Sequence, residues 1–127
     1  MMKHTPVSPE TTFREVADQL RKNVTGIQAI VLVALNGTTP LYFAVDADFH
    51  ADIFAFEYST LLRIARSTSN DLGAGELNEY IAVSERATAI GRRIDAESFL
   101  IVVLGAQDQI GRARYEIKRA ALFLDRQ

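Results

Sequence analysis

Apolar and polar positions repeat along the chain in two periods, one helical and one close to two residues. Helical spacing covers residues 8–26, 48–75 and 108–126. Residues 27–35, 41–45, 77–84, 86–94 and 97–105 read instead as strands, separated by turn residues. The expected order of elements is therefore α-β-β-α-β-β-β-α.

Two of these strands are apolar at nearly every position instead of alternating. In the first, one side would carry Ile27, Ala29, Val31, Val33 and Leu35, and the other Ile30, Leu32 and Ala34. In the last, the two sides are Phe99, Ile101 and Val103, and Leu100, Val102 and Leu104. Strands buried on both faces need a helical layer on each side. We expect an α+β fold, with a five-stranded antiparallel sheet, the middle helix on one face and the two terminal helices on the other.

Residues suited to helix N-caps precede each predicted helix. Ser8 can accept a backbone N–H, and Pro9 suits the first helical position. Asp48 or Asp52 can cap the middle helix, and Asp108 the last one.

The first two strands should form a hairpin. Asn36 and Gly37 are the residues that a type I′ turn prefers, because both of its central positions have positive φ. Pro40 lacks an N–H and favours an edge position. We therefore expect the second strand at the edge of the sheet and the first and last strands side by side at its centre.

The middle helix is apolar over an unusually wide arc. At about 100° per residue the arc spans roughly 200°, and it contains Ile53, Phe54, Ala55, Tyr58, Leu61, Leu62, Ile64 and Ala65. The polar remainder contains Ser59, Arg63, Arg66, Ser67 and Asn70. A stripe that covers one sheet needs only a little over about 100°. We expect a second partner for this helix.

Composition adds limits to this picture. The chain has 127 residues, 48% hydrophobic, with a formal charge of −2 and no cysteine. We expect one domain over residues 8–127 after a flexible lead-in, residues 1–7. The charge favours neither nucleic acid nor an anionic membrane, and no apolar run approaches the ~20 residues of a membrane span. Without a secretory signal pattern, a cytoplasmic protein is expected.

Few residues carry patterns typical of catalysis. The stretch Leu72–Leu77 has two glycines but no lysine, which favours a helix end over a phosphate-binding loop. Asp46, Asp48, His50 and Asp52 could in principle form a metal-dependent hydrolase site, but a solvated loop at a helix start is the stronger interpretation. We expect no metal and no cofactor.

Arg92 and Arg93 stand out on a strand that otherwise carries small and apolar residues. They are candidates for contact with an anion or an acidic partner. The simpler interpretation is a solvent-facing edge with one arginine paired across strands.

Four short motifs together resemble the Roadblock/dynein light chain family, over nearly the whole chain from Thr12 onward. They are Val24-Thr25-Gly26-Ile27, Gly37 with Pro40, Leu72-Gly73-Ala74-Gly75-Glu76-Leu77, and Ile110-Gly111 with Arg114. The family's members are non-catalytic platforms that often dimerise through the middle helix and the following edge strand. Many bind or regulate Ras-like small GTPases, and bacterial members include the GTPase-activating partner of a gliding-polarity GTPase.

The resemblance implies a homodimeric, non-enzymatic regulator or scaffold for a Ras-like small GTPase. If it stimulates GTP hydrolysis, we expect it to reposition the catalytic groups of the GTPase itself, and Arg92 or Arg93 as an inserted finger is the alternative. The implied dimer contacts are Phe54, Tyr58, Leu61, Leu62, Ala65, Tyr80, Ile81, Ala82 and Val83. A small-molecule sensor of the profilin or PAS type remains an alternative, and it would need a cavity near Phe99 or Phe43.

Overall fold

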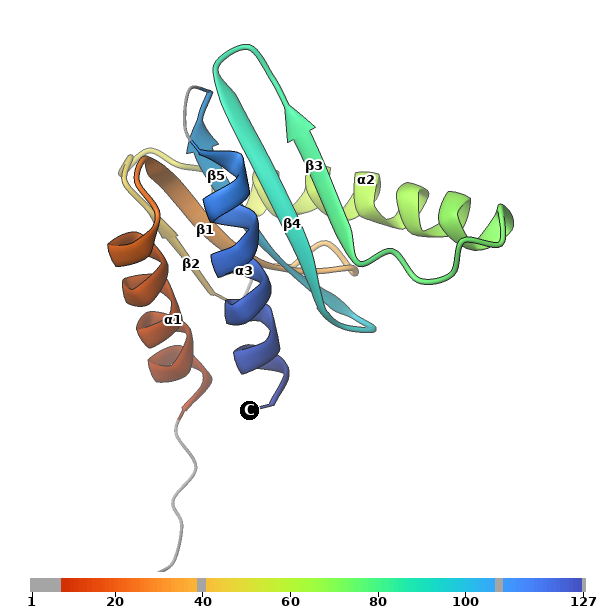
Figure 1. Ribbon diagram of the computed structural model, residues 1–127, viewed down its shortest axis with the longest axis horizontal. Helices are drawn as coiled ribbons and strands as arrows, with labels where there is room; N and C mark the ends of the chain where they lie inside the picture. The colour runs from red at the N-terminus through yellow and green to blue at the C-terminus, as the bar shows by residue number, and fades with distance from the viewer. Residues whose placement is uncertain (1–7, 39–40, 107–108, 127) are drawn as a thin grey trace, which may run out of the picture.

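The computed structural model describes residues 8–38, 41–106 and 109–126, and in them three helices surround a five-stranded sheet (Figure 1). The elements are α1 (Pro9–Asn23), β1 (Ile27–Ala34), β2 (Leu41–Ala44), α2 (Ala51–Asp71), β3 (Glu79–Val83), β4 (Ala87–Asp95), β5 (Ser98–Gly105) and α3 (Ile110–Asp125). This order confirms the α-β-β-α-β-β-β-α prediction. The predicted lead-in at residues 1–7, Pro40 and the cap residue Asp108 lie outside the described residues.

The strands pair in the order β2-β1-β5-β4-β3, and every pair is antiparallel. As predicted, β1 and β5 are neighbours in the interior of the sheet, and β2 lies at an edge. β3 forms the opposite edge.

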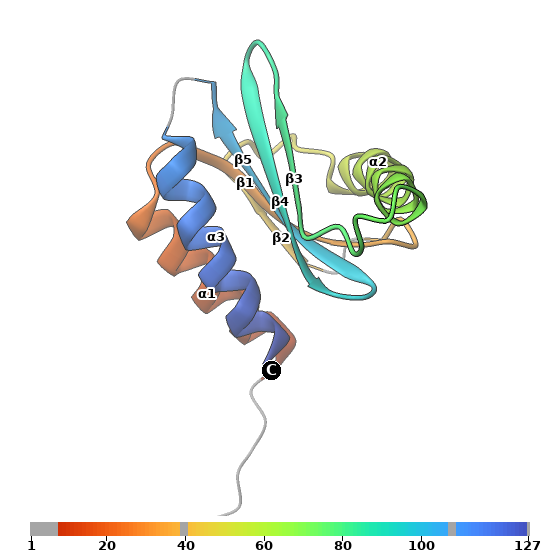
Figure 2. The same cartoon turned by 45° about the vertical axis from the view of Figure 1, so that its right-hand side comes forward.

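The helices form two layers, with α1 and α3 side by side on one face and α2 on the other (Figure 2). Under α1 and α3, Leu20 and Ile117 pack against Leu100 and Val102 of β5. Under α2, Leu62 belongs to the cluster that contains the opposite face of β5. The two apolar faces of β5 are thus both buried, which confirms the predicted three-layer arrangement.

A β-bulge at the start of β1 changes the predicted facing of one residue. Ile27 pairs with Leu104 and Ala29 with Val103, so Gln28 is an extra residue without a partner position on β5. The inserted residue shifts the alternation by one position. Ile27 therefore packs on the α1/α3 side and not with Ala29, contrary to the simple alternation.

The turn after β1 is not the predicted type I′ turn. Gly37 has a φ of 95°, but no residue other than glycine has a positive φ in the described part of the chain, so Asn36 does not meet the I′ requirement. Instead the Gly37 N–H donates to Ala34 O at 3.0 Å, and the Asn36 side chain accepts the Thr38 N–H at 3.0 Å. This local hydrogen bond of asparagine competes with the left-handed conformation at Asn36.

The helix caps follow the prediction at one helix and differ at another. Ser8 is the N-cap of α1, where its side chain accepts the Thr11 N–H at 3.2 Å. The N-cap of α2 is His50, which makes no side-chain cap bond, so neither Asp48 nor Asp52 has the predicted role. Asp48 instead donates its backbone N–H to the Asp46 carboxylate at 2.9 Å, within the preceding turn.

Candidate functional site

The surface formed by α2 and β3 is the largest departure from a closed core. The buried residues of α2 are Ala51, Ala55, Ser59 and Leu62, all within its first twelve positions. In Figure 1 the C-terminal part of the helix continues outward past β3. A single helix therefore covers this face of the sheet only in part.

Two residues of α2 are placed differently from the prediction. Leu62 is fully buried against the sheet, so its predicted place in a contact with a second subunit is wrong. Ser59, expected on the polar side, is also fully buried, and its hydroxyl donates to Phe56 O at 2.9 Å. Its small side chain lets the helix approach the Gly37 turn closely, with Ser59 Oγ 3.6 Å from where a Cβ at Gly37 would be.

Two arginines of α2 attach the helix to the turns beneath it. The Arg63 guanidinium donates to Leu35 O, just after β1. Arg66 donates to Ala96 O at 2.9 Å, between β4 and β5. These contacts fix the rotation of α2 about its own axis and so determine which side chains face outward.

The flank of α2 beside β3 is apolar and only partly covered. Phe54 and Tyr58 stack with their ring centroids 4.6 Å apart, and both are half-buried. Burial raises the pKa of Tyr58, and the nearby Tyr80 of β3 adds to the shift. Leu61 is 42% exposed on the same flank. The structure thus brings Phe54 and Tyr58 of the helix close to Tyr80 of the strand, which are three of the predicted interface residues.

β3 adds an open sheet edge to this flank. Tyr80 and Ala82 pack toward α2, whereas the alternate residues Ile81 and Val83 lie toward the opposite face, where both are exposed. As an edge strand, β3 has backbone N–H and C=O groups on one side that no strand among the described residues pairs. Such an edge can join a second sheet.

A second apolar stripe runs along the outer side of α2, facing away from the sheet. Ile53, Phe56 and Ile64 are each more than half exposed. At about 100° per residue they lie on the side opposite the buried residues. The helical pattern indicated Ile53 and Ile64, but Phe56 fell outside the predicted arc, since one aromatic among polar neighbours gives no periodic signal.

Arg92 and Arg93 do not form one basic site, because they lie on opposite faces of the sheet. Arg93 donates to the Asn78 side chain at 2.9 and 3.2 Å, which holds the approach to β3. Arg92 lies across from Glu79, whose carboxylate is bound by Arg114 at 2.7 Å. Among the described residues Arg92 forms no ion pair, so it is the freer of the two.

The acidic group near the start of α2 does not assemble into a site. Within residues 8–38, 41–106 and 109–126, no three His, Cys, Asp or Glu side chains converge as metal ligands, and this includes Asp46, Asp48, His50 and Asp52. No helix in the same residues has the length and apolar character needed to span a bilayer.

The interior near Phe99 is closely packed. Phe99 is fully buried, and a Cβ added at Gly91 would already lie 3.5 Å from Ile101 and 3.9 Å from Phe99. Phe43 lies under the Arg21 guanidinium, which is 4.1 Å from the ring centroid. These contacts fill the positions where the sensor alternative requires a cavity.

Neither a known protein-family model nor a curated protein matches the sequence. Solved structures do match the fold. MglB of Myxococcus xanthus is 16% identical with a TM-score of 0.86, covering 98% of this chain and 92% of its own. An MglB with a tetrameric arrangement is 17% identical with a TM-score of 0.85, covering 96% and 91%. A Roadblock/LC7 domain from Streptomyces avermitilis is 20% identical with a TM-score of 0.74, covering 82% and 87%.

Profilin II of Acanthamoeba castellanii is less similar, with a TM-score of 0.61 at 15% identity, covering 93% of this chain and 97% of its own. The MglB and Roadblock/LC7 structures named above have the higher TM-scores. The chain therefore has the Roadblock/LC7 fold.

Proposed function

We propose that this protein is a homodimeric regulator or scaffold for a Ras-like small GTPase. The observation that carries the proposal is the apolar surface that α2 leaves exposed beside the free edge strand β3. The Roadblock/LC7 fold and its similarity to MglB support the same function.

The dimer contact uses the flank of α2 and the free edge of β3. Phe54, Tyr58, Leu61 and Ala65 supply partly exposed apolar surface. The edge strand β3 supplies main-chain hydrogen bonds to its copy, with Tyr80 and Ala82 beneath the helix. Leu62 has no part in this contact, because it is buried within its own chain.

The outer stripe of α2, formed by Ile53, Phe56 and Ile64, faces away from this flank and stays exposed in such a dimer. Two copies would present two stripes on one composite surface, which is where we place the GTPase. Stimulation of hydrolysis would act through the catalytic groups of the GTPase itself. Arg92 lies across from Leu100 on the α1/α3 face of the sheet, so it does not reach a GTPase on the outer stripe of α2.

Light scattering on the Leu61→Asp variant tests the dimer. A charge in the centre of the flank costs roughly 2 kcal/mol or more of association energy, so we expect a monomer at tens of micromolar. Leu122→Asp is the matched control, because Leu122 is similarly exposed but lies on α3. A wild-type monomer, or a dimer that survives Leu61→Asp, would contradict the proposed contact.

Calorimetric titration with Ras-like GTPases of the same organism, in GDP and GTP-analogue forms, tests the partner. We expect Phe56→Ala to weaken binding at least about tenfold without dissociating the dimer. In a turnover assay, unchanged hydrolysis with Arg92→Ala and with Arg93→Ala would remove the inserted-arginine mechanism while leaving the binding function intact.

A further inference from the structure

A groove of about 780 Å³ lies between α1 and α3, on the opposite side of the molecule from α2. Its apolar floor includes Val16 and Leu20 of α1 and Ala120 of α3. Leu122 and Phe123, which are 49% and 44% exposed, extend the apolar surface along α3. The proposed dimer and GTPase surfaces use none of these residues.

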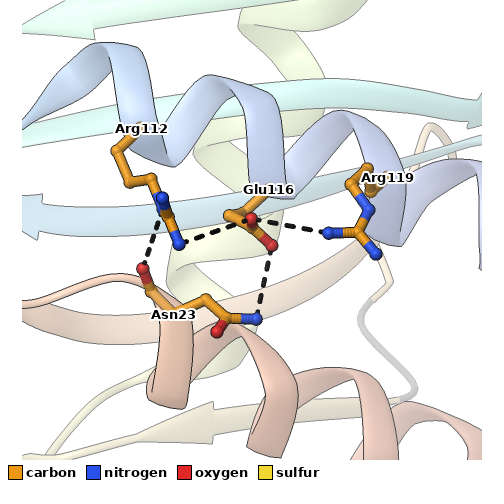
Figure 3. Close-up of polar contacts among 4 residues, drawn as sticks. All are labelled: Asn23, Arg112, Glu116 and Arg119. Carbon is orange, nitrogen blue, oxygen red and sulfur yellow. Dashed lines mark hydrogen bonds and ion pairs between the residues drawn. The ribbon is translucent and has the colours of Figure 1, made fainter.

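The floor also contains a buried carboxylate, Glu116, which is only 7% exposed (Figure 3). Its oxygens lie 3.4 Å from Asn23 Nδ2, 3.6 Å from Arg119 Nη1 and 3.9 Å from Arg112 Nη2. Charge-assisted hydrogen bonds are normally about 2.7–2.9 Å long. Glu116 is therefore surrounded by three donors at longer than ideal distances.

The two walls of the groove carry opposite charge. The α1 wall carries two acidic residues and one basic residue, Glu15, Asp18 and Lys22, and the α3 wall carries two basic residues and one acidic residue, Arg119, Arg126 and Glu116, so the excess charges of the walls are opposite. Apart from the contacts of Glu116 with Arg112 and Arg119, none of these residues takes part in an ion pair within the described part of the chain. The charges face the groove without neutralising one another.

We propose that this groove binds an amphipathic helix of a partner protein, with a basic flank toward α1 and an acidic flank toward α3. The apolar strip of that helix would lie over Leu20 and Ala120, beside Phe123. A helix fits better than an extended segment because side chains of two helices line the groove, so an extended chain would find no sheet edge to pair with. The inference is independent of the GTPase function and goes beyond it.

The probe is a synthetic amphipathic helix of about 18 residues, with leucines at helical spacing, lysines along one flank and glutamates along the other. The matched control has the same composition with both charges mixed on both flanks. We expect the segregated peptide to bind at least about tenfold more tightly in fluorescence anisotropy. Filling the floor with Ala120→Phe should abolish binding without changing any charge.

Charge reversal of the walls gives the sharper test. Glu15→Lys with Asp18→Lys makes both walls basic, and Arg119→Glu with Arg126→Glu makes both acidic, so each pair should weaken binding about tenfold. Turning a helix end for end exchanges its flanks. The variant that carries all four substitutions should therefore restore binding, with the peptide lying in the opposite direction along the groove. A spin label at one end of the peptide reports this direction by NMR.

Equal binding of the two peptides, no binding at millimolar concentration, or failure of the variant with all four substitutions to restore affinity would overturn the proposal. Self-association of the protein that the same wall variants abolish would assign the groove to a second copy and would also overturn it. Circular dichroism of each variant verifies that the fold is intact.

Discussion

The two helical layers differ in how completely they bury their own apolar side chains. On one face, α1 and α3 lie side by side, and Phe13, Val16 and Leu20 of α1 are all at most 5% exposed. On the other face α2 lies alone, with Ile53, Phe56 and Ile64 each more than half exposed. The apolar side chains of α1 are thus buried within the chain, whereas α2 has large apolar side chains exposed on its outer side.

The difference originates in the width of the apolar arc. In α1 the apolar positions form one narrow stripe, which α3 and the sheet bury together. In α2 small residues such as Ala55 and Ser59 contact the sheet, whereas larger apolar residues lie on the flank and the outer side. A wide apolar arc on a helix therefore indicates a surface for a partner only when the sheet of the same chain already covers part of that arc.

The largest expected effect tests whether the two cores are equally important. Leu20→Ala under α1 and Leu62→Ala under α2 should each lower the free energy of unfolding by about 2–5 kcal/mol, because both side chains are at most 2% exposed. Urea denaturation measures this. The neighbouring Leu61→Ala is the control and should cost less than about 1 kcal/mol when measured in a monomeric background. A small loss at Leu62 would mean that α2 is only loosely attached.

The next largest effect concerns the polar contacts between α1 and α3. Glu116→Ala removes the acceptor for Asn23 and the counter-charge of Arg112 and Arg119, so we expect a loss of about 1–3 kcal/mol in unfolding free energy. Glu57→Ala on the exposed side of α2 is the control and should lie within about 0.5 kcal/mol of wild type. Equal effects would contradict the view that Glu116 joins α1 to α3.

Replacing a glycine by alanine should have opposite effects on stability at two positions, one after α2 and one in α3. Gly73 follows α2 with a φ of 74°, so Gly73→Ala should cost about 1 kcal/mol through backbone strain. Gly111, in the first turn of α3, has an ordinary φ and open space where a Cβ would be. Gly111→Ala should stabilise the folded protein by about 0.4–1 kcal/mol. Thermal unfolding measures both variants, and a lower melting temperature for Gly111→Ala or a higher one for Gly73→Ala would contradict these expectations.

The smallest effect concerns pH. The pKa of Tyr58 is raised from 10.0 by burial and then by Tyr80, so the folded state keeps the phenol proton longer than the unfolded chain does. Stability should fall as pH rises above about 10 through the folded pKa. Tyr58→Phe should flatten that fall in urea titrations at successive pH values. An unchanged slope would show that α2 does not bury this hydroxyl.

The strands were predicted more completely than the helices. Residues of β1 and β5 are apolar on both faces, and only strands between two helical layers are buried on both faces. This pattern therefore predicted both the central strands of the sheet and the two helical layers. The bulge at Gln28 gave no signal, because Ile27 is apolar and fits either face. Alternation predicts which residues share a face only where no residue is inserted.

The rotation of α2 about its own axis could not be predicted from the sequence pattern. An apolar arc of roughly 200° does not indicate which part of the arc contacts the sheet. In the structure the side with Ser59 and Leu62 is buried. Other predicted interface residues, such as Phe54 and Leu61, are partly exposed, and their contact with a second subunit stays a prediction. Glu116 was missed because a lone glutamate in a basic helix looks like surface.

The attachment of α2 by Arg63 and Arg66 has a consequence for sequence divergence. Both arginines bind main-chain oxygens, Leu35 O and Ala96 O, which any residue at those positions would supply. Substitutions in the two turns can therefore accumulate without turning the helix, provided that the backbone path is kept. Related chains should vary freely at the exposed position 96, whereas position 35 should stay apolar because the Leu35 side chain is buried under α2.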